Sequence, residues 1–222
     1  MSKFFLFYIL TYLTGNPLPA LLLLLAVVYL VDRNTLRVLP DWSGRLGTWG
    51  RIRALKRTIT LNPDHAGALV DLGRILVRRG DCTQAVPFLE KALPKMADSD
   101  EANFYLGFAY LRTGQLEKAR EQLEKALELN PRFGYGEPHL RLGECYQALG
   151  DLQTAARQLQ QFAEIHSSSS EGFYRLGKVL EKSGKKEEAG RAYRSAVDAY
   201  RSSPRFKRKL DRPWAWKARW AL

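Results

Sequence analysis

Two hydrophobic patterns divide the chain. No side chain is charged between residues 4 and 31, and such a long uncharged run is typical of a membrane-embedded segment. From about residue 45 onward, apolar residues recur every three and four positions, as over 103–113 and 116–129, which predicts amphipathic helices. The sequence therefore predicts an all-α protein, with an N-terminal membrane helix or broken helix pair followed by a region of amphipathic helices.

The uncharged run contains a helix break. Gly15 suits a helix C-cap, Asn16 an N-cap, and Pro17 the first position of a new helix. One interpretation is a single kinked span; the other, which we favour, is a short helix over about 4–14 and a second helix from about 17 to 32. A cleaved signal peptide is disfavoured, because the apolar part is too long and no small-x-small cleavage site follows.

Basic residues on one side of this run predict its orientation. Seven Lys and Arg residues lie within 32–57, whereas only Lys3 precedes the run. The positive-inside rule then places the chain after residue 32 in the cytoplasm, attached to the cell membrane by a single-pass or re-entrant anchor. Within the juxtamembrane basic linker, 33–44, we expect Arg33 and Arg37 to contact the membrane surface.

The rest of the chain repeats with a period of 34 to 36 residues. A Leu-Gly pair begins at Leu72, Leu106, Leu142 and Leu176. A second glycine follows seven residues later, at Gly80, Gly114, Gly150 and Gly184, and an alanine five residues after that, at Ala85, Ala119, Ala155 and Ala189. The second glycine predicts the C-cap of a first helix, whereas the first glycine and the alanine predict close crossing of two helices.

This register resembles the tetratricopeptide repeat (TPR). The second copy matches at Leu106, Gly107, Tyr110, Ala119, Leu123, Ala126 and Pro131, whereas the fourth has Leu180 in place of the tyrosine. The resemblance covers about 45–201, as a half repeat at 45–63 and repeats at about 66–99, 100–135, 136–169 and 170–203. It implies an α-solenoid of about four helix-turn-helix repeats, wound into a superhelix. The concave face of such a superhelix, lined by the first helices, holds a peptide or a partner helix.

The repeat register also predicts which side chains line that concave face. The candidate partner groove is basic with aromatic patches: Arg74, Arg78, Phe104, Phe108, Arg112, Arg141, Tyr174, Arg175 and Lys178. It suits an acidic, partly apolar segment of a partner or a membrane protein. In the alternative interpretation, Phe104 and Phe108 pack against neighbouring helices and the charges are solvated. No Asn occupies these positions, which disfavours the carboxylate clamp of TPR domains that dock chaperone C-termini.

The C-terminal segment 204–222 is basic and rich in tryptophan. Pro213 suits a helix start, and Trp216 and Trp220 are four residues apart. One interpretation is a contact with anionic lipid at the membrane surface through Trp214, Trp216, Trp220 and Lys217. The other is a capping helix whose tryptophans cover the last repeat. A nucleic-acid partner is not expected, because the excess positive charge lies at the two ends of the chain, whereas residues 58–200 carry a net charge of −1.

Candidate catalytic chemistry is sparse. Two cysteines and three scattered histidines leave little room for a metal site, and no phosphate-binding loop or catalytic motif is present. We therefore expect no enzyme, cofactor or metal. The predicted function is a membrane-anchored TPR scaffold or adaptor that mediates protein–protein interaction at the cytoplasmic membrane face. The alternative is a structural or assembly subunit of a larger integral-membrane complex, contacting it through residues 1–32.

Overall fold

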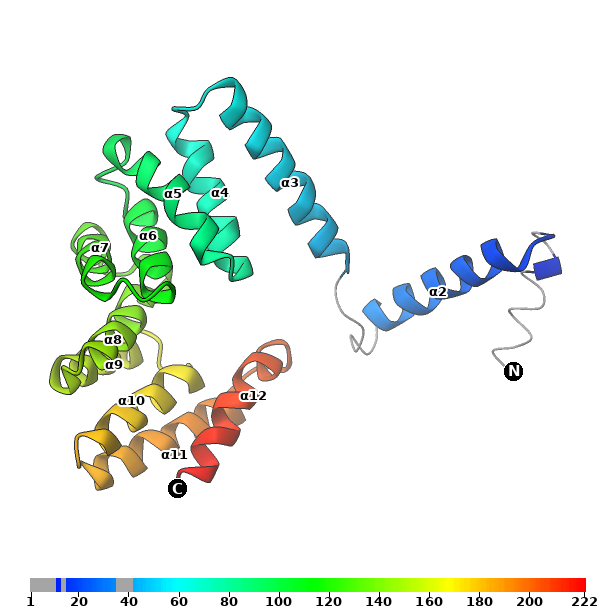
Figure 1. Ribbon diagram of the computed structural model, residues 1–222. Helices are drawn as coiled ribbons and strands as arrows, with labels where there is room; N and C mark the ends of the chain where they lie inside the picture. The colour runs from blue at the N-terminus through cyan, green and yellow to red at the C-terminus, as the bar shows by residue number, and fades with distance from the viewer. Residues whose placement is uncertain (1–10, 13–14, 35–41) are drawn as a thin grey trace. The chain divides into compact units, whose positions relative to one another are not determined.

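The computed structural model describes the backbone of residues 11–12, 15–34 and 42–222, and the side chains of residues 11–12, 15–29 and 47–222. The chain forms two compact units, residues 1–51 and 52–222. Every regular element in the described ranges is helical (Figure 1).

The first unit contains α2 (Pro17–Asn34). Gly15 has a φ of +63°, and the Asn16 side chain accepts a hydrogen bond of 3.0 Å from the Leu18 N–H, so the predicted helix start at Pro17 is confirmed. Most of the predicted helix over 4–14 and of the linker 33–44 lies outside the described residues. Among those that are described, no helix is both long enough and apolar enough to cross a bilayer.

The second unit begins within α3 (Trp42–Leu61) and continues as helix pairs. The pairs are α4 (Ala66–Arg79) with α5 (Cys82–Ala92), α6 (Asp100–Arg112) with α7 (Leu116–Leu129), α8 (Glu137–Leu149) with α9 (Leu152–Ile165), and α10 (Ser170–Lys182) with α11 (Lys186–Ser202). Short 3₁₀ turns, η1 (Leu93–Lys95) and η2 (Phe133–Tyr135), follow α5 and α7. Figure 1 shows the pairs stacked in chain order from cyan to orange, so the four predicted repeats are present.

A glycine in each first helix lets the second helix approach closely. A Cβ atom at Gly73 would lie 2.4 Å from Leu89 Cγ, and one at Gly143 would lie 2.5 Å from Leu159 Cγ. Both distances are far below van der Waals contact, so a side chain there would force the pair apart. The same relation joins Gly107 to Leu123 and Gly177 to Tyr193. The predicted close crossing is therefore confirmed in all four repeats.

The second glycine of each repeat follows the first helix in a left-handed conformation, as predicted. The φ angles are +90°, +81°, +90° and +80° at Gly80, Gly114, Gly150 and Gly184. This conformation is strained for residues with a Cβ atom, so glycine is the residue that permits these helix ends.

The second unit has a core of its own. Buried apolar clusters run through it from Ile52 to Ala218, and among the described residues no cluster includes a residue before Ile52. Because repeats bury their apolar faces against their neighbours, residues 52–222 carry the contacts needed to fold as one unit.

The helix α12 (Arg205–Trp220) completes the second unit by packing on α10 and α11. Ala215 and Ala218 are buried, and the buried Asp211 carboxylate accepts a hydrogen bond of 2.7 Å from the Ser203 hydroxyl. The predicted helix start at Pro213 was wrong, because the helix begins two turns earlier and Pro213 lies inside it. Proline removes one helical N–H there without ending the helix.

Candidate functional site

The first helices of successive repeats are joined along one face by contacts of arginine side chains. Arg74 on α4 forms a 3.0 Å ion pair with Glu101 on α6. The Arg78 guanidinium lies 5.9 Å from the ring centre of Tyr105, also on α6. These arginines are the predicted groove residues of the first repeat, and we call the surface that they begin the first-helix face.

Arg141 is at the centre of this face. Its guanidinium forms ion pairs of 2.6 Å with Glu144 and 2.9 Å with Glu137. Burial by itself would lower the pKa of Arg141, but Glu144 and Glu137 outweigh burial and raise it. Arg141 therefore stays charged and is neutralised by its neighbours.

Arg175 extends the same network to the next repeat. It forms ion pairs of 3.2 Å with Glu144 on α8 and 2.8 Å with Glu171 on α10. Its guanidinium also lies 4.9 Å from the ring centre of Trp214 on α12. The network thus runs across three helices and links the last two repeats to the capping helix.

These pairings change the interpretation of the predicted groove. Arg74, Arg141 and Arg175 were predicted to offer positive charge to a partner, but each is paired with carboxylates of this chain. The carboxylate of Glu101 reaches Arg74 from the next first helix, α6, and that of Glu171 also reaches Arg141 from the next first helix, α10, at 3.9 Å. Sequence reasoning missed these two because the register identifies the positions on one helix and not which side chains of the next helix reach them.

The prediction that Phe104 lines the partner groove was wrong. Its side chain is 1% exposed and its ring centre lies 4.9 Å from that of Phe133 in η2. It therefore belongs to the core, as in the alternative interpretation, and does not line an open surface. Phe108 is half-buried, and the Arg141 guanidinium lies over its ring, with Cζ 4.3 Å from the ring centre. Tyr174 is half-buried as well, between Tyr193 and Trp214.

Three predicted groove residues keep exposed charges. Arg78, Arg112 and Lys178 are exposed, and in the part of the chain that the structure describes no carboxylate forms an ion pair with them. Arg112 borders a hollow of about 290 Å³. The hollow is lined by Leu111, Arg112, Glu144, Gln147, Ala148 and Arg175. We call it the Arg112 hollow; it is open, partly apolar and bounded by two guanidinium groups.

At two junctions between repeats, a tyrosine of a first helix forms a hydrogen bond with a glutamate of the second helix before it. The Tyr110 hydroxyl donates a 2.5 Å hydrogen bond to Glu90 on the preceding second helix, and Tyr146 bonds to Glu124 in the same way. Burial, together with this bond to Glu124, raises the pKa of Tyr146 to about 12. These two tyrosines therefore tie consecutive repeats together.

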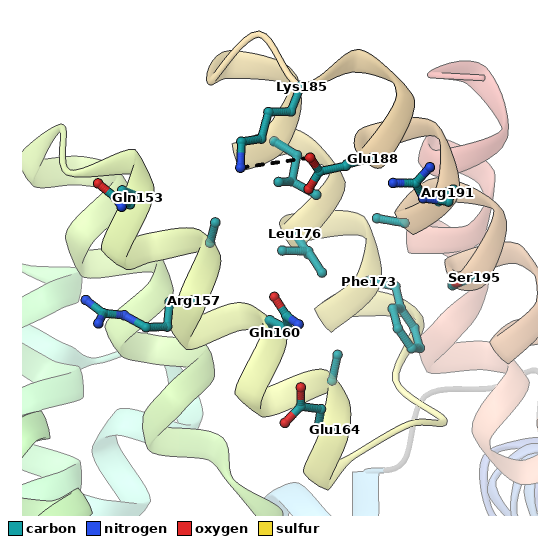
Figure 2. A pocket seen from close by; sticks show the side chains of 14 residues that line it. Gln153, Arg157, Gln160, Glu164, Phe173, Leu176, Lys185, Glu188, Arg191 and Ser195 are labelled. Atoms are coloured by element: carbon teal, nitrogen blue, oxygen red, sulfur yellow. Dashed lines mark ion pairs between the residues drawn. The ribbon is translucent and has the colours of Figure 1, made fainter.

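At the last junction both partners of this bond are replaced. Leu180 occupies the tyrosine position and Gln160 the glutamate position, and a groove of about 490 Å³ lies there, between α9 and α11. Figure 2 shows Gln160, Leu176 and Phe173 in this groove, with the Lys185–Glu188 ion pair at one end. The departure at Leu180 was visible in the sequence, but the groove was not.

The structure separates the tryptophans predicted to contact a membrane. Trp214 is half-buried and its ring centre lies 5.7 Å from that of Tyr174, so it covers the last repeat. Trp216 and Trp220 are 64% and 76% exposed. Lys217 is exposed, with its ammonium group over the Trp214 ring. Arg37 and the Arg33 side chain lie outside the described residues.

Within the described ranges, no group of three or more His, Cys, Asp or Glu side chains is arranged to hold a metal ion. Both thiols are inside the protein. Burial raises the pKa of Cys82, and it raises the pKa of Cys145 to about 11. These thiols are therefore poor nucleophiles at neutral pH.

Comparison with known proteins agrees with the repeat geometry. Tetratricopeptide repeat models match residues 52–101 and 140–204, and a further one matches residues 100–133. The chain belongs to the tetratricopeptide repeat family. This fold is a protein-interaction scaffold and not an enzyme architecture.

Individual proteins match this chain over a short stretch or at low sequence identity. The chain is 35% identical over 78 residues to the BBSome complex member bbs-4 of Caenorhabditis elegans, a match that covers 34% of this chain and 17% of that protein. Among solved structures, a crystal structure of MamA superimposes with a TM-score of 0.64 at 23% identity, over 73% of this chain and 96% of that one. A structure of MamA from Desulfovibrio magneticus RS-1 superimposes with a TM-score of 0.65 at 18% identity, over 80% of this chain and 96% of that one. These likenesses show the fold.

Proposed function

We propose that this protein is a non-enzymatic TPR scaffold that binds an acidic, partly apolar segment of another protein on its first-helix face. The observation that carries this proposal is the Arg112 hollow. It places an exposed guanidinium without an ion-pair partner, among the described residues, next to the apolar side chain of Leu111. A carboxylate of the bound segment would pair with Arg112, and an apolar side chain beside it would cover Leu111.

The paired arginines support this assignment in another way. Arg141 and Arg175 are held by carboxylates from two helices, so the floor of the face is fixed before a partner arrives. A preorganised surface loses less conformational entropy on binding. Arg78 and Lys178, exposed on other repeats, would attract an acidic segment over a longer stretch of the face.

Site-specific photocrosslinking tests this proposal. A photoreactive amino acid at Gln147, which lines the Arg112 hollow, should capture a partner in cells, whereas one at Gln160, in the second-helix groove, should not. Arg112→Glu should abolish the Gln147 crosslink, and Arg157→Glu, an exposed arginine on α9, should preserve it. Capture at Gln160 alone, or a Gln147 crosslink that survives Arg112→Glu, would contradict the assignment.

We also propose that residues 4–31 attach the scaffold to the cell membrane, with the repeats in the cytoplasm. The uncharged sequence supports this, as do Leu18, Leu22 and Leu25 of α2, which are 56% to 67% exposed. Exposed leucines on one short helix are costly in water and favourable in lipid. Alkaline extraction of membranes should leave the full chain in the pellet and release a form without residues 1–44.

A second candidate function is a structural or assembly subunit of a larger integral-membrane complex, contacted through residues 1–32. The turn at Gly15 and the new helix start at Pro17 favour it, because an anchor that only spans lipid needs no break. Pull-downs from detergent extract separate the two functions. Partners lost with residues 1–44 support the complex subunit, and partners kept by residues 52–222 support the adaptor.

A further inference from the structure

The outer side of α12 carries a stripe of exposed apolar side chains. Phe206, Leu210, Trp216 and Trp220 are 78%, 73%, 64% and 76% exposed. At 100° per residue these four positions fall within about 120° of one another around the helix. The rings of Trp216 and Trp220 contact edge to face with centres 5.5 Å apart. We call this surface the α12 stripe.

The opposite side of α12 is already occupied. Asp211, Ala215 and Ala218 are buried there against the last repeat, and Trp214 stacks on Tyr174. The α12 stripe is therefore not the packing face of the capping helix. Four large apolar side chains thus remain exposed on a helix whose buried residues lie on its other side.

Positive charge surrounds the stripe. Arg205, Lys209, Arg212, Lys217 and Arg219 are exposed on the same helix. The one acidic residue of α12, Asp211, is buried on the other side, where it pairs with Lys207 and Ser203. The surface thus combines aromatic rings with basic side chains, and among the described residues no carboxylate forms an ion pair with any of these five.

From these observations we infer that the α12 stripe is a docking surface for an anionic lipid membrane. Tryptophan rings are stable at the boundary between headgroups and acyl chains, and Phe206 and Leu210 would enter the same layer. The basic side chains would lie among the anionic headgroups, where each adds to the attraction. This charge pattern selects an anionic surface over a neutral one, and the apolar stripe requires an interface that can accept hydrocarbon.

This membrane contact is separate from the proposed partner site at the Arg112 hollow and from the proposed attachment through residues 4–31. The Arg112 hollow lies between α6, α8 and α10 and shares no residue with the stripe. Residues 4–31 are absent from the fragment 52–222, which contains the whole core of the second unit. The fragment also has its tryptophans at 214, 216 and 220 alone, so tryptophan emission reports on α12.

Co-flotation of the fragment 52–222 with vesicles tests the inference. With phosphatidylcholine vesicles containing about one third phosphatidylglycerol, we expect binding, a blue shift of tryptophan emission, and weaker binding as salt rises. With pure phosphatidylcholine we expect at least about a tenfold lower partition coefficient. Trp216→Ser with Trp220→Ser, or Lys209→Gln with Arg212→Gln, should each lower binding to the anionic vesicles by about tenfold or more.

Matched variants control for general loss of apolar surface or charge. Leu61→Ser with Tyr135→Ser removes two apolar side chains that are both 78% exposed elsewhere, and Arg191→Gln with Arg194→Gln removes two exposed charges of α11. Both should leave binding unchanged, and all four variants should keep the helicity and melting temperature of the fragment. Equal binding to both vesicle types, full binding by the tryptophan variant, or self-association through the stripe without vesicle binding would overturn the inference.

Discussion

The guanidinium of Arg141 lies over the ring of Phe108, with Cζ 4.3 Å from the ring centre. This contact joins the third repeat to the second, and the ion pairs of Arg141 with Glu144 and Glu137 keep the guanidinium in place. A cation over an aromatic face is favourable when both are partly removed from water. The first-helix face therefore combines arginines paired within the chain, such as Arg141, with the exposed charges of Arg78, Arg112 and Lys178.

Alanine substitutions should distinguish the two phenylalanines of α6. Phe104→Ala should destabilise the protein by about 3–5 kcal/mol, because a fully buried ring leaves a cavity. Phe108→Ala should cost clearly less, since the ring is half-buried and part of its contact is with one guanidinium. Urea unfolding of both variants measures the difference; equal costs would show that our distinction between core and face is wrong.

Glu144→Gln should weaken the network that joins α8 to α10. The substitution removes the charge that two guanidinium groups share, and hydrogen bonds to charged groups contribute about 1.5–3 kcal/mol. Glu128→Gln is the matched control, because its ion pair with Lys125 is exposed and should contribute below about 1 kcal/mol. Thermal melting in low salt compares the two variants, and a similar loss in both would contradict the role assigned to Glu144.

The groove between α9 and α11 should close when the missing hydrogen bond is restored. Leu180→Tyr with Gln160→Glu recreates the pairing of Tyr110 with Glu90, and should stabilise the protein by about 1 kcal/mol relative to the sum of the single substitutions. A double-mutant cycle from urea unfolding measures this coupling. The absence of coupling would show that the geometry of the last junction, and not its side chains, keeps the groove open.

The thiol of Cys145 should respond to pH in a defined direction. Burial raises its pKa to about 11 in the folded protein, whereas an unfolded thiol ionises near pH 8.5. Between these values the unfolded state binds fewer protons, so the Cys145 contribution to stability falls as pH rises. Unfolding at pH 7.5 and 9.5 should show a smaller loss for Cys145→Ala than for the unchanged chain. An equal loss would mean that the thiol ionises normally.

Local patterns determined the repeat architecture in advance. The spacing of Gly73 and Gly80, repeated three more times, specified the close helix crossings and the left-handed helix ends, because each depends on the missing Cβ atom of one residue. Asn16 and Pro17 specified the start of α2 for the same kind of reason: their effect is exerted within one turn of the chain. Features that depend on residues within one turn of each other can be predicted from the sequence alone.

Tertiary structure decided which predicted site residues are available. Phe104 is closed off by Phe133, which comes from a turn 29 residues later, and Arg175 is neutralised by Glu144, from another repeat. The exposure of Trp216 beside the covered Trp214 depends on which side of α12 meets the last repeat. Such outcomes depend on how separate helices pack. The contacts between them join residues that are far apart in the sequence, so no local pattern predicts them.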